Sequence, residues 1–281
     1  ITGATAFNMT TSGTNQLNGS VTNANITNTG NLTTKNSTIG NSVVNNGTIN
    51  LVNTIVNGDI TNNGTLNLKT GTALTNAISS TNNNGVINVN NNWTLSNTIS
   101  GNKINVNNST LKVGSNYLDN TDTINAKNSK IDIGANTVNL KSMKLDGSST
   151  LSLKINGLED GQHGLLNITD SMTINSGAKL KATLAQGINY GEVTLIKAGS
   201  HNGDFADKDV SHTEEGVDVA ENNMYKFIKT KGKFGVFSIL QKSTAADVAK
   251  EQGARSWVAN AAGAWVDEAP FAEEIGRASC R

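Results

Sequence analysis

The feature that most constrains the fold is a repeat of 17 residues. Glycines stand at positions 13, 30, 47 and 64, each 17 residues after the one before. Aligning the chain on these glycines places aliphatic side chains in three columns: Leu32, Ile49 and Leu66; Leu17, Leu51 and Leu68; and Ile26, Val43 and Ile60. Because a fixed period of this kind is the signature of repeat architectures, each repeat is predicted to form one turn of a solenoid.

The pattern within each repeat is that of a half-buried β-strand. Thr48-Ile49-Asn50-Leu51 and Thr65-Leu66-Asn67-Leu68 alternate polar and aliphatic residues, so every second side chain faces the interior. Turns that stack about 4.8 Å apart pair their backbones and bury a continuous core. The predicted fold class is all-β, a right-handed parallel β-helix (β-solenoid) over residues 1–187, with a C-terminal β-rich cap and a terminal α-helix.

The period changes along the chain. It loosens after Gly85 and re-forms near 20 residues in segments that begin at Asn108, Asn128 and Ser148. The predicted interior face is aliphatic and the exterior face is Asn or Thr. Asn and Gly tolerate positive φ at turns, and asparagines on neighbouring turns are expected to stack as amide ladders. An unstructured Asn-rich segment is the alternative, but disorder would not keep aliphatic residues in register.

The composition argues for a polar, nearly uncharged surface. Asparagine supplies 26 of the first 100 residues, and only Lys35, Asp59 and Lys69 are charged there, so amides and hydroxyls carry solubility. The net charge is zero and no basic cluster stands out, so nucleic acid is not an expected partner. No apolar run is long enough for a membrane-spanning helix. The single cysteine, Cys280, lies in the last eight residues, and the cysteine-free remainder of the chain is compatible with export.

Both ends of the sequence indicate a fragment. The chain starts at Ile1 without a methionine and shows no signal peptide. Residues 274–281, EIGRASCR, look like the translation of a sequencing adapter and are interpreted as an artefact. The alternative is a natural C-terminus with an exposed thiol at Cys280.

From about Met172 asparagine thins out and aromatic residues gather. Residues 224–239 alternate about a turn near Lys231-Gly232, which predicts a β-hairpin. A solenoid needs a cap on its last open edge, so residues 188–242 are predicted to be that cap. Its candidate structural residues are Tyr190, Leu195, Phe205, Tyr225, Phe227, Phe234 and Phe237.

A single helix is predicted over residues 243–269. Thr244 and Asp247 can start it as a capping box. Trp257, Ala261 and Trp265 follow at helical spacing and form one face of small and indole side chains. This face is interpreted as packing on a neighbouring element; the family resemblance described next implies instead that it contacts the wall of a membrane barrel.

The order of these elements resembles the C-terminal part of a bacterial autotransporter (type V secretion) passenger of the adhesin-like class. An Asn/Gly/Thr solenoid precedes YGEVTLIKAG at residues 190–199 and Gly203-Asp-Phe205, then a strand-rich cap and an Ala-rich helix. The resemblance implies that residues 188–242 are an autochaperone region and that residues 243–269 are a linker towards an outer-membrane β-barrel translocator in the same full-length chain. The barrel itself is missing from the sequence.

Catalytic chemistry has little support in the sequence. No phosphate-binding loop, HExxH motif or nucleophile elbow appears, and no cofactor or metal is predicted. A β-helical polysaccharide lyase or glycosidase remains the alternative function, since it needs two neighbouring carboxylates. Its candidates are Asp119, Asp122, Asp132 and Asp146, which are better explained as solvating residues.

Three further alternatives stay open. His163, His201 and His212 are interpreted as surface or turn residues rather than ligands, and Trp93 as a core or turn filler rather than a sugar platform. An ice-binding surface would need long threonine rows, whereas the Thr48 and Thr65 row stops at Asn31 and Val86.

The function expected from the sequence is therefore non-enzymatic. The chain is expected to be a surface-exposed or secreted passenger fragment at the bacterial outer membrane. It would act in adhesion or cell contact through an elongated, uncharged, amide-rich face. Its ligand, on a host or bacterial cell surface, is not specified by the residues.

Overall fold

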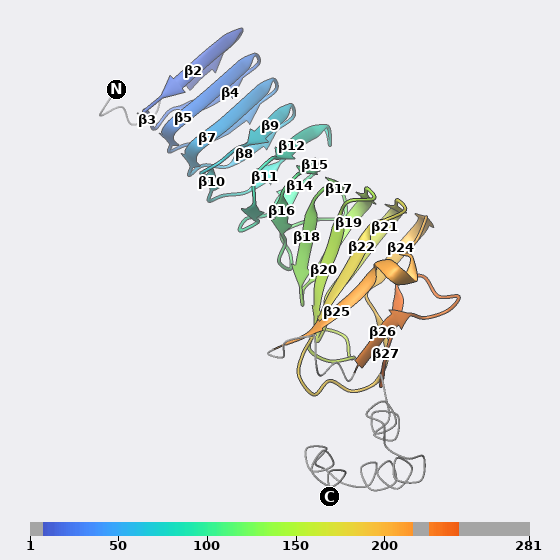
Figure 1. Ribbon diagram of the computed structural model, residues 1–281. Coiled ribbons are helices and arrows are strands. Elements are labelled where there is room, and N and C mark those ends of the chain that lie inside the picture. The colour runs from blue at the N-terminus through green and yellow to red at the C-terminus, as the bar shows by residue number, and fades with distance from the viewer. Residues whose placement is uncertain (1–7, 216–224, 242–281) are drawn as a thin grey trace, which may run out of the picture.

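The structure is a computed structural model that describes residues 8–215 and 225–241. Within these residues the chain winds into a rod of stacked turns, with the first strands at one end and the last strands at the other (Figure 1). Three parallel β-sheets form the sides of the rod, and one antiparallel β-sheet lies near its C-terminal end. The predicted parallel β-solenoid is thereby confirmed.

The longest sheet, here the long sheet, runs along the whole rod and is flanked by a different sheet in each half. Its strands are β2 (Thr14–Asn18), β3 (Val21–Thr22), β5 (Asn31–Ile39), β7 (Thr48–Val56), β9 (Thr65–Leu68), β10 (Ala73–Leu74), β12 (Gly85–Val89), β15 (Asn102–Asn107), β17 (Thr123–Lys127), β19 (Thr137–Leu145), β21 (Leu165–Ile174) and β24 (Ile196–Asn202). The N-terminal sheet consists of β1 (Asn8–Thr11), β4 (Asn25–Asn28), β6 (Val43–Asn45), β8 (Ile60–Asn62), β11 (Ile78–Ser79) and β14 (Ile99–Ser100). The C-terminal sheet consists of β13 (Trp93–Thr94), β16 (Thr110–Lys112), β18 (Lys130–Gly134), β20 (Thr150–Ile155), β22 (Lys179–Leu184) and β25 (Val210–Glu214).

The aliphatic columns predicted from the repeat are present in register. Leu32 pairs with Ile49, which pairs with Leu66, and each of the three side chains is 1% exposed. The Ile26, Val43 and Ile60 column is likewise in register and buried. The third column contains a residue that the sequence alignment left out, because Thr34 lies between Leu17 and Leu51.

Buried hydroxyls explain how threonine fits into that column. Thr34 and Thr54 are both 0% exposed, and their Oγ1 atoms lie 2.9 Å apart in a hydrogen bond. Thr54 Oγ1 also donates to the carbonyl oxygen of Val52. The interior is therefore aliphatic with polar insertions, and the hydroxyls of Thr34 and Thr54 are satisfied within the rod. This corrects the expectation of a purely aliphatic interior.

The glycine column has a cause different from the expected positive φ. Among these four glycines only Gly13 has positive φ. A Cβ atom built on Gly30 would overlap the backbone of Gly13, one on Gly47 the carbonyl oxygen of Gly30, and one on Gly64 the carbonyl oxygen of Gly47. The column therefore consists of glycine because successive backbones approach one another too closely for any side chain.

Turn length grows along the rod. Side-chain hydrogen bonds between neighbouring turns span 17 residues near the N-terminus, 20 residues in the middle, and 29 to 30 residues near the C-terminal end. The expected lengthening to about 20 residues is present, and the last turns are longer still. The exchange of the N-terminal sheet for the C-terminal sheet takes place over residues 93–100, where β13 and β14 begin one sheet and end the other.

The C-terminal end of the rod combines parallel and antiparallel pairing. The antiparallel sheet has the strand order β23 (Gly191–Thr194), β27 (Val236–Gln241), β26 (Tyr225–Lys229), and Gly232 has φ of 76° in the connection between β26 and β27. This is the hairpin that the sequence predicts. Strands β24 and β25, which fall inside the predicted cap residues, instead continue the parallel sheets of the solenoid, and the 3₁₀ helix Asp207–Asp209 lies between them.

Candidate functional site

A column of asparagine amides runs through the interior of the N-terminal half. Asn28 Nδ2 donates to Asn45 Oδ1 at 2.8 Å, and Asn45 Nδ2 donates to Asn62 Oδ1 at 2.8 Å. All three side chains are 0% exposed. Asn28 Nδ2 also donates to the backbone carbonyls of Gly30 and Thr48, which fixes the orientation of the amide. We call Asn28, Asn45, Asn62 and Asn102 the buried amide column.

The buried amide column ends on a carboxylate. Asn62 Nδ2 donates to Asn102 Oδ1 at 3.1 Å across Gly85, whose absent side chain leaves the space that the Asn102 amide fills. The backbone N–H of Asn102 donates to Asp122 Oδ1, and that of Asp119 donates to Asp122 Oδ2. Asp122 is 0% exposed, and this burial raises its pKa to about 7 although both backbone hydrogen bonds act in the opposite direction.

A second row of amides lies on the outer face of the long sheet. Each Nδ2 donates to the neighbour on the preceding turn, at distances of 2.7 to 3.3 Å. We call this half-buried series the amide row; its members are Thr33, Asn50, Asn67, Asn88, Asn105 and Asn125. Because an amide has two donor hydrogens and two acceptor lone pairs, each asparagine in the row retains hydrogen-bonding capacity towards solvent or a ligand.

The surroundings of the amide row are mostly uncharged. Asn31, Thr48, Thr65 and Val86 pair in register beside it, so the threonine row is two residues long, as the sequence indicates. The outward residues of the N-terminal sheet are also uncharged, and they carry hydroxyl or aliphatic groups; examples are Thr27, Val44 and Thr61. The expected amide-rich outer surface is present on the long sheet, where the amide row lies.

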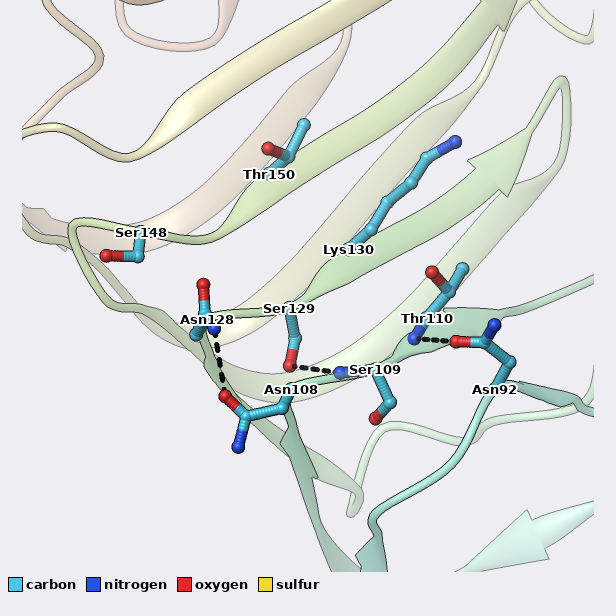
Figure 2. A pocket seen from close by; sticks show the side chains of 9 residues that line it. All are labelled: Asn92, Asn108, Ser109, Thr110, Asn128, Ser129, Lys130, Ser148 and Thr150. Atoms are coloured by element: carbon cyan, nitrogen blue, oxygen red, sulfur yellow. Dashed lines mark hydrogen bonds between the residues drawn. The ribbon is translucent and has the colours of Figure 1, made fainter. Parts of the chain in front are cut away.

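A shallow polar groove lies at the corner between the long sheet and the C-terminal sheet. Figure 2 shows its lining, to which three successive turns contribute equivalent residues. Asn128 Nδ2 donates to Asn108 Oδ1 at 2.9 Å, and the backbone N–H of Ser109 donates to Ser129 Oγ at 3.2 Å. We call it the corner groove; its lining residues are Asn92, Asn108, Ser109, Thr110, Asn128, Ser129, Lys130, Ser148 and Thr150.

Backbone conformation explains why asparagine occupies the corner. Asn108 and Asn128 have φ of 49° and 47°, values that Asn tolerates better than other residues with side chains. The serines that follow them, Ser109 and Ser129, are buried. Ser129 Oγ accepts the backbone N–H of Ser109 on the preceding turn, and Ser109 Oγ donates to the carbonyl oxygen of Val89. The Asn-Ser pair therefore changes the direction of the chain and also supplies hydrogen-bond partners for backbone groups at the corner.

The four candidate carboxylates have separate local roles. Asp122 is buried under the column described above, and Asp119 accepts hydrogen bonds from the backbone N–H and hydroxyl of Thr121. Asp132 forms an ion pair with Lys130 at 3.1 Å on the outer face of β18. Asp146 accepts from Ser149 Oγ and from the backbone N–H groups of Asn128 and Ser148, contacts that outweigh the desolvation and lower its pKa. Each carboxylate thus stabilises a turn or a strand.

The histidines lie near the C-terminal end, in separate contacts. His163 is 3% exposed and its Nε2 lies 3.0 Å from the carbonyl oxygen of Thr194. His201 stacks on Phe234 with ring centroids 3.9 Å apart, and His212 meets Phe227 edge-on at 6.2 Å. Of the two alternatives expected, a surface or a turn residue, burial excludes the surface position for His163. Over residues 8–215 and 225–241 no group of three His, Cys, Asp or Glu side chains is placed to hold a metal ion.

Aromatic residues of the predicted cap gather around the antiparallel sheet. Phe227 stacks on Phe237 with centroids 5.2 Å apart, and Tyr225 donates its hydroxyl to the carbonyl oxygen of Ile188. The buried members of the predicted set are Leu195, Phe205, Tyr225, Phe227 and Phe237. Phe234 is partly buried, and Tyr190 is 47% exposed.

The aromatic cluster lies beside the inward face of β25, the last strand of the C-terminal sheet. His212 and Glu214 there pair with Ala182 and Leu184 of the preceding turn, so aliphatic residues give way to polar ones. Phe227 of β26 packs against His212 at this point. Trp93, at the start of the C-terminal sheet, is half-buried and packs against the core, in agreement with a filler role.

Two predicted elements lie outside the described residues. These are the helix over residues 243–269, with Trp257, Ala261 and Trp265, and the terminal segment 274–281. Among the residues that are described, no helix has the length and apolar character needed to cross a membrane.

The fold and its polar surfaces define the chain as a parallel β-solenoid with an asparagine-rich exterior. In comparisons with known proteins, no protein-family model, no curated protein and no solved structure matches the chain.

Proposed function

We propose that the chain is the passenger part of a bacterial autotransporter, exported to the cell surface, where it acts in adhesion or cell contact without catalysing a reaction. The observation that carries the proposal is the amide row, an ordered polar surface that continues over six turns of a rod. A rigid rod places such a surface at a distance from the membrane.

The stacking order of the solenoid supports export. Each turn pairs only with its neighbours, so a chain that emerges unfolded from an outer-membrane translocator would add one turn at a time. The aromatic cluster around the antiparallel sheet would be the autochaperone region that offers the first template. Low charge over the N-terminal half keeps the moving chain free of strongly hydrated groups.

The adhesive role is tested by changing the amide row alone. Beads coated with the purified chain are presented to bacterial and epithelial cells, and the bound fraction is counted. The double variant Asn67→Lys and Asn88→Lys adds two charges to the row, and its binding is expected to fall. A matched variant, Thr27→Lys and Thr61→Lys, adds the same charge to the N-terminal sheet and is expected to bind as the parent does. Equal binding by all three proteins would contradict the proposal.

A further inference from the structure

The corner groove repeats along the axis of the rod. Each of three turns contributes a corner residue and a strand residue at equivalent positions: Asn108 with Thr110, Asn128 with Lys130, and Ser148 with Thr150. The corner residues are exposed, and Asn108 and Asn128 are already linked by an amide hydrogen bond (Figure 2). A ligand that lies along this groove meets one polar corner residue and one polar strand residue on every turn, and successive turns lie about 4.8 Å apart. Such a site suits a linear polymer rather than a compact small molecule.

Lysines extend the groove across the outer face of the C-terminal sheet. Lys130, Thr150 and Lys179 pair in register, so the two lysines lie two strands apart, about 10 Å. Lys181 projects from the same face, two residues beyond Lys179. We call Lys112, Lys130, Lys154, Lys179 and Lys181 the lysine face.

Only part of this positive charge is neutralised. Lys130 pairs with Asp132, and Lys154 pairs with Glu215 at 3.0 Å. Lys112, Lys179 and Lys181 are exposed and form no ion pair with any residue of 8–215 or 225–241. The lysine face therefore carries unpaired positive charge beside a groove of amides and hydroxyls.

The side-chain chemistry identifies the polymer. Amides and hydroxyls match the hydroxyl groups of sugars as paired donors and acceptors, and ammonium groups match carboxylates or sulfates. Nucleic acid fits less well, because single strands are held mainly by aromatic stacking and the groove lining contains no aromatic side chain. No arginine, the usual bidentate partner of phosphate, occurs in residues 8–215 or 225–241.

We propose that the corner groove and the lysine face together bind a linear acidic polysaccharide that lies along the axis of the solenoid. The groove and the lysine face lie on a different side of the rod from the amide row, although Asn88, Asn105 and Asn125 of the row belong to the same turns as the groove. It is therefore independent of the adhesive surface proposed above, and either proposal can fail without the other.

The test measures binding of the purified chain by surface plasmon resonance to heparin, polygalacturonate, dextran and a single-stranded oligonucleotide. Heparin and polygalacturonate are expected to bind, and dextran and the oligonucleotide are not. The double variant Lys179→Glu and Lys181→Glu reverses two unpaired charges. Its affinity for the acidic polysaccharides is expected to fall at least about tenfold, because the loss of even one charge-assisted hydrogen bond has an effect of that size.

The control makes the same change on another face. Lys103→Glu and Lys141→Glu reverse two exposed lysines of the long sheet and are expected to leave binding within about twofold, since these groups lie outside the groove. Circular dichroism establishes that both variants are folded. Equal loss in the two variants, or equal binding of the oligonucleotide, would reduce the site to general polyanion attraction and overturn the proposal, as would no binding to either acidic polysaccharide.

Discussion

Replacement of Asn45 by alanine is the most direct test of the buried amide column. Asn45 makes four hydrogen bonds: it donates to Asn62 Oδ1 and to the carbonyl oxygen of Thr65, and its Oδ1 accepts from Asn28 Nδ2 and from the backbone N–H of Gly47. The variant removes a hydrogen-bond partner from Asn62 Oδ1, in a side chain that is 0% exposed, and from the N–H of the half-buried Gly47. At 1 to 3 kcal/mol for each unsatisfied group, the free energy of unfolding is expected to fall by about 4 kcal/mol.

The same substitution in the amide row supplies a matched control. Asn50 makes two hydrogen bonds, to Thr33 Oγ1 and from Asn67 Nδ2, but it is half-buried and water can replace both. Asn50→Ala is therefore expected to cost about 1 kcal/mol or less. Both residues belong to the same turn, so the comparison varies the burial of the amide while the residue type and position along the rod stay the same.

The assay is urea denaturation followed by far-ultraviolet circular dichroism, together with amide hydrogen exchange. Exchange of the Gly47 and Thr65 amides reports the local effect, because each turn is coupled mainly to its neighbours. A similar loss of stability in Asn45→Ala and Asn50→Ala would refute the reasoning, since burial would then not decide the contribution of an amide hydrogen bond.

Three further predictions concern other parts of the rod. Gly47→Ala is expected to lower the free energy of unfolding by about 3 kcal/mol, because the added Cβ would overlap the Gly30 carbonyl oxygen. Gly232→Ala, whose Cβ would meet no neighbour, is expected to cost about 1 kcal/mol. Equal thermal midpoints for the two variants would contradict the close-approach explanation. The carboxyl of Asp122 binds its proton more tightly in the folded chain than in the unfolded chain. The free energy of unfolding is therefore expected to fall as pH rises from about 4 to about 7, by at most about 1.4 kcal/mol per pH unit. Titration of this carboxyl by NMR measures the pKa, and a midpoint near about 4 would show that burial does not raise it. Phe227→Ala is expected to slow refolding in stopped-flow experiments if the antiparallel sheet templates the solenoid, whereas a change confined to the unfolding rate would argue against templating.

The sequence predicted the parallel core because its signal is redundant. Leu32, Ile49 and Leu66 share a 17-residue spacing with their glycines, and only stacked turns can bury such a column. Asn28, Asn45 and Asn62 of the buried amide column carry the same spacing, each two residues before a glycine of the repeat. Their burial was missed because asparagine is usually exposed, and only the three-dimensional register shows that each amide has a partner on the next turn.

The lysine face could not be found by searching for a basic cluster in the sequence. Lys130 precedes Lys179 and Lys181 by two turns in the sequence, and only strand pairing through β20 places it on the same face as these two lysines. The length of a complete turn varies from 17 to 30 residues along the rod, so these lysines have no fixed sequence spacing by which the site could be recognised. The same variability explains why the predicted cap residues include strands that belong to the solenoid.

The two amide series described above point in opposite directions along the rod. In the buried amide column each donor lies on the earlier turn, whereas in the amide row each donor lies on the later turn. The electric dipoles of the two series therefore oppose each other, unlike the aligned peptide dipoles of an α-helix, which sum to partial charges at its ends. The buried amide column thus offsets part of the polarity that the amide row adds as the rod grows.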